Sequence, residues 1–195
     1  MKTRLLFFLC LVLCAASCGP KAGWTREESA LIFESDSVMR VLTIEDPSDL
    51  AVLRAQTDSL TPGMLRSPEY AALQRKLVRT VTDPSQDGVG IAGPQVGISR
   101  RVVCVMRFDK WGDPFLVYPN IRITGHRGEK ELGTEGCLSV PGRRGEVPRY
   151  QDIDIAYTSP YTLQDTTERV MGFTAVIFQH ECDHLDGILY IDYLD

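Results

Sequence analysis

Two histidines four residues apart, with a glutamate beside the first, form the most informative cluster in this chain. His180, Glu181 and His184 lie in the sequence His-Glu-Cys-Asp-His. Residues i and i+4 share one face of a helix, so both imidazoles can bind the same metal ion. A glutamate beside the first ligand can reach a metal-activated water and act as a general base. The spacing therefore predicts a mononuclear centre with hydrolytic chemistry.

A third protein ligand is available from a cysteine in the middle of the chain. Cys137 lies in the sequence Glu-Gly-Cys-Leu-Ser, and its thiolate would be a strong ligand whose charge a cation stabilises. The alternative is a small buried apolar residue. Cys104, within an apolar segment, and Cys182, which points away from the histidine face, are predicted to be core residues. An odd, widely spaced trio does not suit a disulfide framework.

A glycine-rich segment lies upstream of this cysteine. Gly88–Gly97 has the sequence Gly-Val-Gly-Ile-Ala-Gly-Pro-Gln-Val-Gly. Its small residues permit a close approach of the backbone to a ligand or to another strand. No Lys-Ser/Thr pair follows, so a nucleotide site is weakly supported. Gln95 is a neutral donor in this apolar stretch, and its amide either stabilises an oxyanion or satisfies the loop backbone.

The elements that must position these residues are mainly strands, closed by one helix. The helix that carries the histidines is predicted over Phe173–Leu185, and Gly187 ends it. Ser67, followed by Pro68, starts an earlier helix that stops before Pro84. Strands are predicted at 37–44, 101–108, 115–123, 150–157 and 163–171, and residues 45–66 are expected to be mostly loop. This pattern indicates the α+β class.

The body of the chain is acidic. The 195 residues carry a formal charge of −5, and without residues 1–17, which contain Lys2 and Arg4, the charge is −7. A nucleic-acid grip needs a basic surface, so we expect no nucleic-acid partner. The length and a hydrophobic fraction of 44% predict one globular domain with a buried core. We expect a monomer.

The N-terminus has the composition of an export signal. Lys2 and Arg4 precede an apolar run of 12 residues from Leu5 to Ala16. A helix that spans a bilayer needs about 20 residues, so the run is too short to cross one comfortably. An ordinary cleaved signal and an uncleaved anchor are alternatives to the interpretation that follows.

The residues after the apolar run resemble a bacterial lipobox. Ala15, Ala16 and Ser17 precede Cys18, although that motif usually has leucine where Ala15 stands. We therefore predict a lipoprotein-type signal peptide over 1–17, lipidation of Cys18, a tether over 18–36 and a catalytic domain over 37–195. The lipid would hold the protein on a membrane at the periplasmic or cell-surface side. A cytoplasmic location is the alternative.

Three segments, in order, resemble the signature motifs of peptide deformylases. They are Gly88–Gly97, Glu135–Ser139 and His180–His184, and the resemblance covers roughly residues 38–195. It departs at Gly93, where the family usually has alanine. The resemblance implies antiparallel sheets packed around a C-terminal metal-binding helix. It also implies removal of the formyl group from N-formylmethionyl peptides, with an N-formylated peptide as the substrate.

The resemblance also implies roles for single residues. Cys137, His180 and His184 would bind one divalent ion with water as the fourth ligand. The ion is Fe²⁺ by family, and Zn²⁺, Ni²⁺ or Co²⁺ can occupy the site. Glu181 would take a proton from the water and deliver it to the leaving amine.

Further residues complete the expected site. The amide of Gln95 and the backbone N–H of Leu138 would stabilise the oxyanion. Arg149 also matches the family and is expected to pair with Glu135 or Asp183. Helical spacing places three apolar residues on the face of His180. With the glycine-rich loop they are expected either to line a methionine pocket or to pack in the core: Val89, Gly90, Phe173, Val176 and Ile177.

Two other functions fit part of the pattern. His-Glu-x-x-His alone permits a zincin-type metallopeptidase, but those enzymes take a histidine or carboxylate as third ligand and not a cysteine such as Cys137. A non-enzymatic peptide-binding lipoprotein is the second alternative. The presence of Glu181 and Gln95 beside a full ligand set argues against it.

Overall fold

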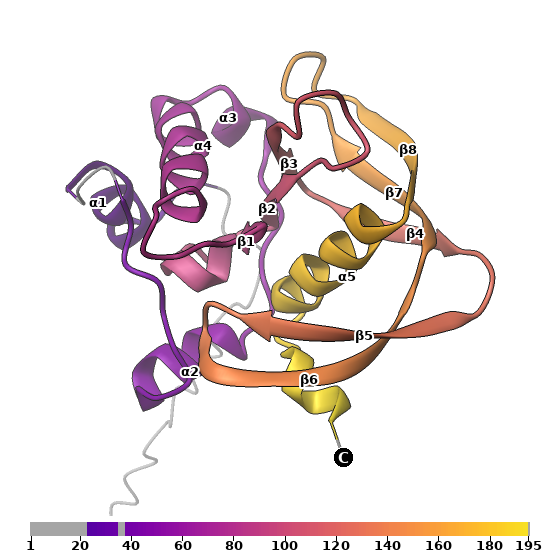
Figure 1. The fold of residues 1–195 in the computed structure, drawn as a ribbon. Helices are drawn as coiled ribbons and strands as arrows, with labels where there is room; N and C mark the ends of the chain where they lie inside the picture. The colour runs from indigo at the N-terminus through magenta and orange to yellow at the C-terminus, as the bar shows by residue number, and fades with distance from the viewer. Residues whose placement is uncertain (1–22, 35–37, 195) are drawn as a thin grey trace, which may run out of the picture.

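The helix that carries the two histidines runs through the middle of the molecule (Figure 1). The computed structural model describes residues 23–34 and 38–194. Helix α5, Phe173–Leu185, has the bounds that the sequence predicts. Gly172 before it and Gly187 after it have φ of 65° and 73°, a backbone conformation that favours glycine. The chain therefore turns sharply at both ends of α5.

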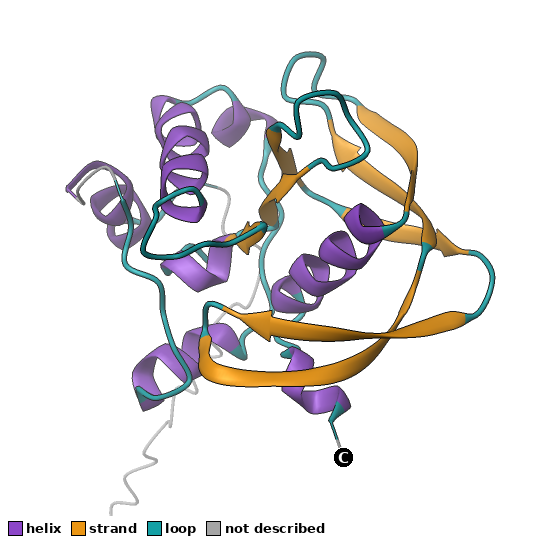
Figure 2. Ribbon diagram, in the orientation of Figure 1, coloured by secondary structure: helices purple, strands orange, loops and turns teal. Residues whose placement is uncertain are grey.

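Three antiparallel sheets lie around this helix (Figure 2). One sheet has the order β1-β2-β3, with strands Gly90–Ala92, Val102–Met106 and Phe115–Pro119. A second has the order β4-β7-β8, with strands Arg122–His126, Asp152–Thr158 and Asp165–Met171. The third is a long hairpin of β5, Lys130–Cys137, and β6, Val140–Tyr150. The α+β class with antiparallel sheets around a C-terminal helix is confirmed.

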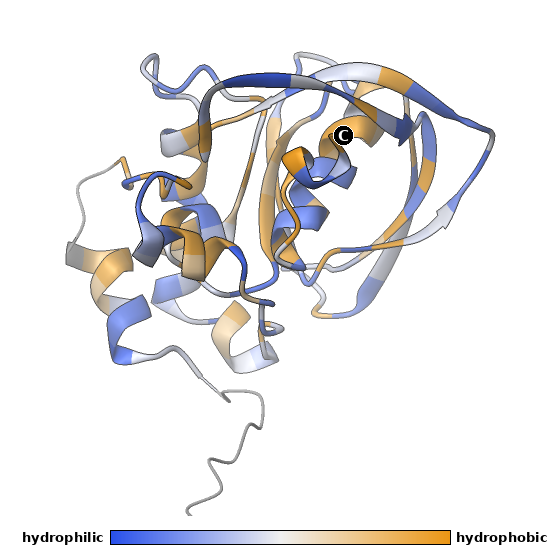
Figure 3. Ribbon diagram, turned by 90° about the horizontal axis from the view of Figure 1, so that it is seen from below, coloured by the Kyte–Doolittle hydropathy of each residue, from blue (hydrophilic) through white to orange (hydrophobic). Residues whose placement is uncertain are grey.

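Two buried clusters hold these layers together. Helix α4, Pro68–Val81, packs Leu73 and Leu77 against the first sheet. Helix α5 packs Ile177 and Phe178 in a cluster shared with β2 and β7. Each such buried side chain stabilises the fold by about 1.5–3 kcal/mol. The β5–β6 hairpin buries few side chains and is largely blue to white in Figure 3, so α5 is fixed mainly by the other two sheets.

Two parts of the predicted loop 45–66 form short helices instead. Helix α2 spans Pro47–Leu53 and helix α3 spans Pro62–Leu65. The side chain of Asp46 accepts a hydrogen bond from Ser48 N at 2.7 Å, and Thr61 accepts one from Met64 N at 3.3 Å. A proline directly after a capping residue suits the first helical turn. The prediction of loop over 45–66 is wrong because it treats these prolines only as helix breakers.

The expected first strand, 37–44, does not join a sheet. Its described part, 38–44, has no strand partner and makes single main-chain hydrogen bonds. Leu42 N donates to Gln95 O at 2.8 Å, and Ile44 N donates to Ser139 O at 2.9 Å. The apolar residues of this segment therefore tie two loops together instead of extending a sheet.

The other strand predictions hold, except that one predicted strand is divided in two and one hairpin is missed. β2, β7 and β8 lie within the predicted strand ranges to within one residue. The predicted strand 115–123 is instead β3 and β4, in different sheets. The corner is Asn120, at φ 55°, whose side chain bonds both Leu60 N and Leu60 O at 2.7 and 2.9 Å. The β5–β6 hairpin is missed as strand, because its glycines and charged residues hide the alternation.

Part of the predicted tether is folded onto the domain. Helix α1, Arg26–Glu34, lies beside α4 (Figure 1), and Ile32 is fully buried in the same cluster as Leu73. A helix this short is marginal in water without tertiary packing. Residues 23–34 are thus a docked element, which corrects the expectation of a tether there.

The predicted signal peptide and Cys18 lie outside the described residues, as do 19–22 and 35–37. Among the helices formed by residues 23–34 and 38–194, none is both long and apolar enough to cross a bilayer.

Candidate metal centre and active site

Three potential metal ligands converge where the end of β5 meets α5. The ligand atoms of Cys137, His180 and His184 all lie within 4.8 Å of one another. Cys137 Sγ is 3.2 Å from His184 Nε2. The two imidazoles come from consecutive turns of α5, as the i, i+4 spacing predicts. The thiol comes from the β5–β6 hairpin, 43 residues earlier in the chain.

An ion-pair chain holds the first histidine from behind. His180 Nδ1 donates to Glu135 Oε2 at 2.8 Å, which leaves Nε2 as the ring atom for a metal. Arg149 donates to Glu135 Oε1 at 2.7 Å and to Asp183 at 2.6 Å. Arg149 therefore pairs with both of the acids that the sequence offered as alternatives. Burial alone would raise the pKa of Glu135, but the hydrogen bonds from His180 and Arg149 outweigh burial and hold it below its usual range.

The residues fit a divalent cation. One sulfur and two imidazole nitrogens form a donor set that takes Zn²⁺ or Fe²⁺. His184 Nδ1 and Glu181 Oε2 are buried and have no hydrogen-bond partner among the described residues. Buried polar atoms are normally satisfied, so Glu181 Oε2 indicates a bound group or water beside the three ligands. His184 Nδ1 lies on the opposite edge of its ring from Nε2, the atom near Cys137 Sγ.

Glu181 lies at the floor of this site under a glycine. Its side chain is buried, and desolvation raises its pKa to about 7. A side-chain carbon added at Gly90 would overlap Oε1 of Glu181 and lie 2.9 Å from Cδ of the same residue. The glycine-rich loop therefore approaches a carboxylate here, and the absent side chain at position 90 makes room for it.

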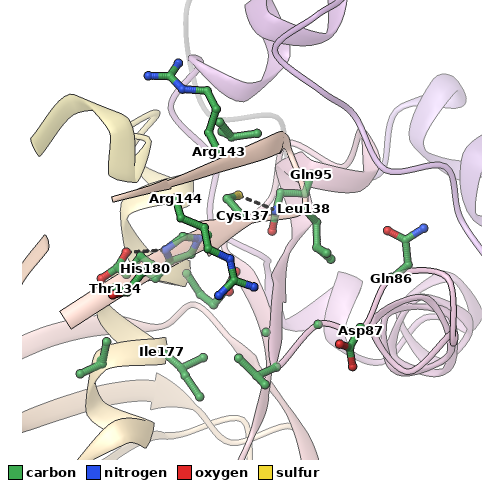
Figure 4. A pocket seen from close by; sticks show the side chains of 18 of the residues that line it. Gln86, Asp87, Gln95, Thr134, Cys137, Leu138, Arg143, Arg144, Ile177 and His180 are labelled. Atoms are coloured by element: carbon green, nitrogen blue, oxygen red, sulfur yellow. Dashed lines mark hydrogen bonds and ion pairs between the residues drawn. The ribbon is translucent and has the colours of Figure 1, made fainter. Parts of the chain in front are cut away.

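Gln95 is held so that its amide nitrogen faces the cysteine. It lies in a short 3₁₀ helix, η1, Gly93–Val96. Its Oε1 accepts the N–H of Ala92 at 2.8 Å. Its Nε2 is 3.2 Å from Ser139 Oγ and 3.5 Å from Cys137 Sγ (Figure 4). Because the side-chain oxygen of Gln95 accepts a backbone hydrogen bond, the NH₂ group of the same amide is held toward the metal ligands.

These groups open into one cavity of about 910 Å³. All the apolar residues predicted from the sequence line it: Val89, Gly90, Phe173, Val176 and Ile177. Leu138 lines it as well, next to Cys137 (Figure 4). Phe173 is 55% exposed and contacts the ring of Phe108 at 5.4 Å between centroids. The cavity thus has an aromatic residue at its rim, and Glu181, Cys137 and His180 line it as well.

The other two cysteines of the described chain do not reach this cavity. Cys104 and Cys182 are buried core residues, and burial raises the pKa of both thiols. This agrees with their predicted core positions. Cys137 is half-buried and faces the cavity.

Three charged residues around the cavity are not predicted from the sequence. Arg143 and Arg144 come from the turn end of the β5–β6 hairpin, and Asp87 lies across the cavity from them (Figure 4). Exposed charges near a turn give no sequence signal of their own, and only the pairing of β5 with β6 brings them over the site.

A family model described as polypeptide deformylase matches residues 38–195. The chain belongs to this family. A peptide deformylase of Leptospira biflexa is 32% identical over 165 residues, which cover 81% of this chain and 88% of that protein. Peptide deformylase 2 of Nostoc sp. is 46% identical over 128 residues, which cover 60% of this chain and 66% of that protein.

Solved deformylase structures show the same fold. A class I type b peptide deformylase from Acinetobacter baumannii with Met-Ala-Ser bound has a TM-score of 0.71, 32% identity and coverage of 80% of this chain and 98% of that one. The Thermotoga maritima peptide deformylase has a TM-score of 0.69 and 31% identity, and the match covers 81% of this chain and 98% of that one. As a deformylase, the chain is a metal-dependent hydrolase of N-formylmethionyl peptides. The comparisons support this function over the zincin and non-enzymatic alternatives.

Proposed function

We propose that the metal ligands, Glu181, the oxyanion donors and the apolar wall of the cavity have distinct roles in hydrolysis of the formyl amide. The observation on which this rests is a buried carboxylate oxygen of Glu181 that has no hydrogen-bond partner in residues 23–34 and 38–194, beside three converging metal ligands. Cys137, His180 and His184 would hold the divalent ion. When bound, such an ion supplies a Lewis acid and lowers the pKa of water.

Glu181 moves the proton. Its carboxylate accepts a proton from the attacking water and later delivers it to the amine that leaves as the formyl group is removed. Oε2 has no hydrogen-bond partner within the part of the chain that the structure describes, so this oxygen is available to a water molecule. Gly90 leaves the space in which the carboxylate sits.

Gln95 and Leu138 stabilise the oxyanion. The Nε2 of Gln95 donates to the developing charge, since its Oε1 is already fixed by Ala92 N. The backbone N–H of Leu138, between Cys137 and Ser139, is the second donor. A donor that is fixed before the reaction needs no reorganisation when charge develops.

The apolar wall of the cavity accepts the methionine side chain. Val89, Val176 and Ile177 line it, with Phe173 at the rim. The bound Met-Ala-Ser of the related Acinetobacter structure supports a peptide with an N-terminal methionine as the occupant of the corresponding site.

The experiment is deformylation of a formyl-Met peptide by the purified protein under reducing, oxygen-free conditions. The protein is loaded in turn with Fe²⁺, Zn²⁺, Ni²⁺ or Co²⁺. We expect release of formate with at least one ion and no cleavage of an unformylated protein. Proteolysis without deformylation would favour the zincin alternative. Absence of both activities with a bound ion would favour a binding protein.

We further propose that the protein is exported and held on a membrane by a lipid on Cys18. The support is the order of basic residues, apolar run and small residues before that cysteine. Substrates would then be formylated peptides that have already left the cytosol. An oxidising compartment threatens Cys137 and a ferrous ion, so Zn²⁺ becomes the favoured metal there.

A lipid on Cys18 would hold the domain close to the membrane. The described chain begins at Gly23. Five Cα–Cα steps of at most about 3.5 Å each separate Cys18 from Gly23, so the lipidated cysteine would lie within about 18 Å of Gly23. This follows from the docking of α1, and it replaces the longer tether expected from the sequence.

A further inference from the structure

Helix α1 lies before the segment that matches the deformylase family, yet it is anchored to the domain by specific contacts. The family match begins at residue 38, and α1 ends at Glu34. Thr25 and Glu28 cap the helix reciprocally: Glu28 N donates to Thr25 Oγ1 at 3.1 Å, and Thr25 N donates to Glu28 Oε2 at 2.9 Å. Ile32 is fully buried in the cluster that contains Val96 and Ile98.

A buried ion pair joins α1 to the chain just before β2. Arg100 donates to both carboxylate oxygens of Glu28, at 2.8 and 2.9 Å. It also donates to Gly23 O at 2.8 Å. Arg100 is 0% exposed and Glu28 is 7% exposed. Asp58 is a more distant partner, with 3.8 Å between Arg100 Nη1 and Asp58 Oδ2. Removing the nearer carboxylate from a buried guanidinium is unfavourable, so docked α1 helps to fix the position of Arg100.

The main chain of Arg100 packs directly on η1. A side-chain carbon added at Gly93 would lie 2.8 Å from the carbonyl oxygen of Arg100 and 2.7 Å from that of Ile98. Ile98 N also donates to Gly93 O at 2.9 Å. Gly93 is the position where this chain departs from the family's alanine. Glycine at this position allows a tight backbone contact between η1 and residues 98–100.

A second contact reaches the other end of the same turn. Leu31 Cδ1 lies 3.1 Å from the place of a side-chain carbon on Gly97, which follows η1 at φ 78°. The turn Gly93–Gly97 is therefore packed at both ends. Arg100, the ion-pair partner of α1, contacts Gly93, and Leu31 of α1 contacts Gly97. Gln95 lies between these two ends and faces the metal ligands.

We propose that α1 is a brace that positions the Gln95 amide. The carboxylate of Glu28 fixes Arg100, the backbone of Arg100 fixes Gly93, and Leu31 supports Gly97. Glu28 and Leu31 are positioning residues, since neither touches the substrate. The inference rests on the proposed role of Gln95 in deformylation. It gives α1, which lies outside the region that matches the family, a role in positioning a group of the active site.

The test uses Glu28→Gln in the full chain, assayed on a formyl-Met peptide well below the unfolding temperature. We expect kcat to fall by about tenfold, a fraction of the 10²–10³-fold that removal of an oxyanion donor costs, with little change in KM. Leu31→Ala, whose parent side chain is 42% exposed, should act in the same direction and leave the core intact. It therefore provides the test if Glu28→Gln does not fold.

A double-mutant comparison separates positioning from loss of stability. In a Gln95→Ala background, Glu28→Gln should change kcat by less than about twofold, since the group it positions is gone. Glu168→Gln, a change on β8, is the matched control, because it breaks another ion pair of a fully buried arginine, Arg107, which follows β2. It should lower stability and leave kcat unchanged.

Each outcome decides between hypotheses. An unchanged kcat in both Glu28→Gln and Leu31→Ala would overturn the brace. An equal fall in kcat with and without Gln95 would also overturn it, because the effect would then not pass through that amide. A wild-type protein without deformylase activity would instead contradict the proposed function itself.

Discussion

Replacing the carboxylate of Glu181 by an amide removes the proton acceptor and keeps nearly the same shape. We expect Glu181→Gln to lower kcat by about 10²–10⁴-fold, the usual contribution of a general base. Metal content should not change, because Cys137, His180 and His184 are untouched. Formate release and metal analysis of the same sample check this. Glu131→Gln, an exposed change on β5, is the control, and full activity of Glu181→Gln would mean that another residue is the base.

The close contact between Gly90 and Glu181 gives a second test at the same scale. A side-chain carbon at position 90 would overlap the carboxylate and lie 2.9 Å from Ile177 Cγ2. Gly90→Ala should therefore displace Glu181, and a misplacement of about 1 Å can cost about 10²-fold in rate. Gly133→Ala is the matched control, since nothing lies within 4 Å of the added carbon. Equal activity of Gly90→Ala and Gly133→Ala would contradict the requirement for an exact position of the Glu181 carboxylate.

At the scale of elements, Arg149 joins the hairpin to α5. Its guanidinium is buried and pairs with Glu135 on β5 and Asp183 on α5. We expect Arg149→Leu to lower the free energy of unfolding by about 3–5 kcal/mol, because it takes the guanidinium away from two largely buried carboxylates. Chemical denaturation measures this.

The comparison variant is Arg122→Leu. Arg122 pairs with Asp165, and both side chains are about half exposed, at 49% and 58%. An exposed pair contributes about 0–1 kcal/mol, so this variant should be nearly neutral. Equal destabilisation in the two variants would contradict the structural role of the buried pair.

The ion pairs that link loops and strands also set a pH dependence. Arg107 donates to Glu168 at 2.7 Å, and this hydrogen bond holds the pKa of Glu168 below its usual range. A carboxyl whose pKa is lower in the folded state stabilises the fold above its ordinary pKa of about 4.3. That stability is lost as the pH falls through the lower, folded-state value.

We therefore expect the stability difference between wild type and Glu168→Gln to be largest near neutral pH and to shrink in acid. Urea unfolding of both proteins at a series of pH values between about 7 and 3 measures this. Lys110 and Asp109 also contact this cluster and remain in both proteins. A difference that grows as the pH falls would contradict the assigned direction of the pKa shift.

At the scale of the whole molecule, the proposed export signal would decide where the enzyme works. We expect native protein in the membrane fraction, with Cys18 as its modified first residue. Cys18→Ser should abolish the modification, and Cys14→Ser, within the apolar run, should not. Cell fractionation and mass spectrometry of the N-terminus check both variants. Native protein in the soluble cytosolic fraction with Met1 intact would end the export hypothesis.

The sequence by itself determined the chemistry of the metal site and the helix that presents it. His180, Glu181 and His184 are close in sequence, and helical geometry alone brings the imidazoles together. The bounds of α5 and α4 also follow from local signals, namely glycines, a capping serine and apolar spacing. For Gln95 the residues leave two alternatives open, and the resemblance to a family favours the oxyanion role. The role of Leu138 rests on that resemblance alone.

The tertiary structure decided the features that depend on residues far apart in the chain. The β5–β6 hairpin brings Cys137 to the histidines and the two arginines over the cavity, and its strand pairing has no strong local pattern. The capping of α2 and α3 turned predicted loops into helices, because proline both breaks and starts helices. The docking of α1 through Glu28 and Arg100 spans 72 residues. No local pattern encodes such a contact, since its energy comes from burial that exists only once the chain has folded.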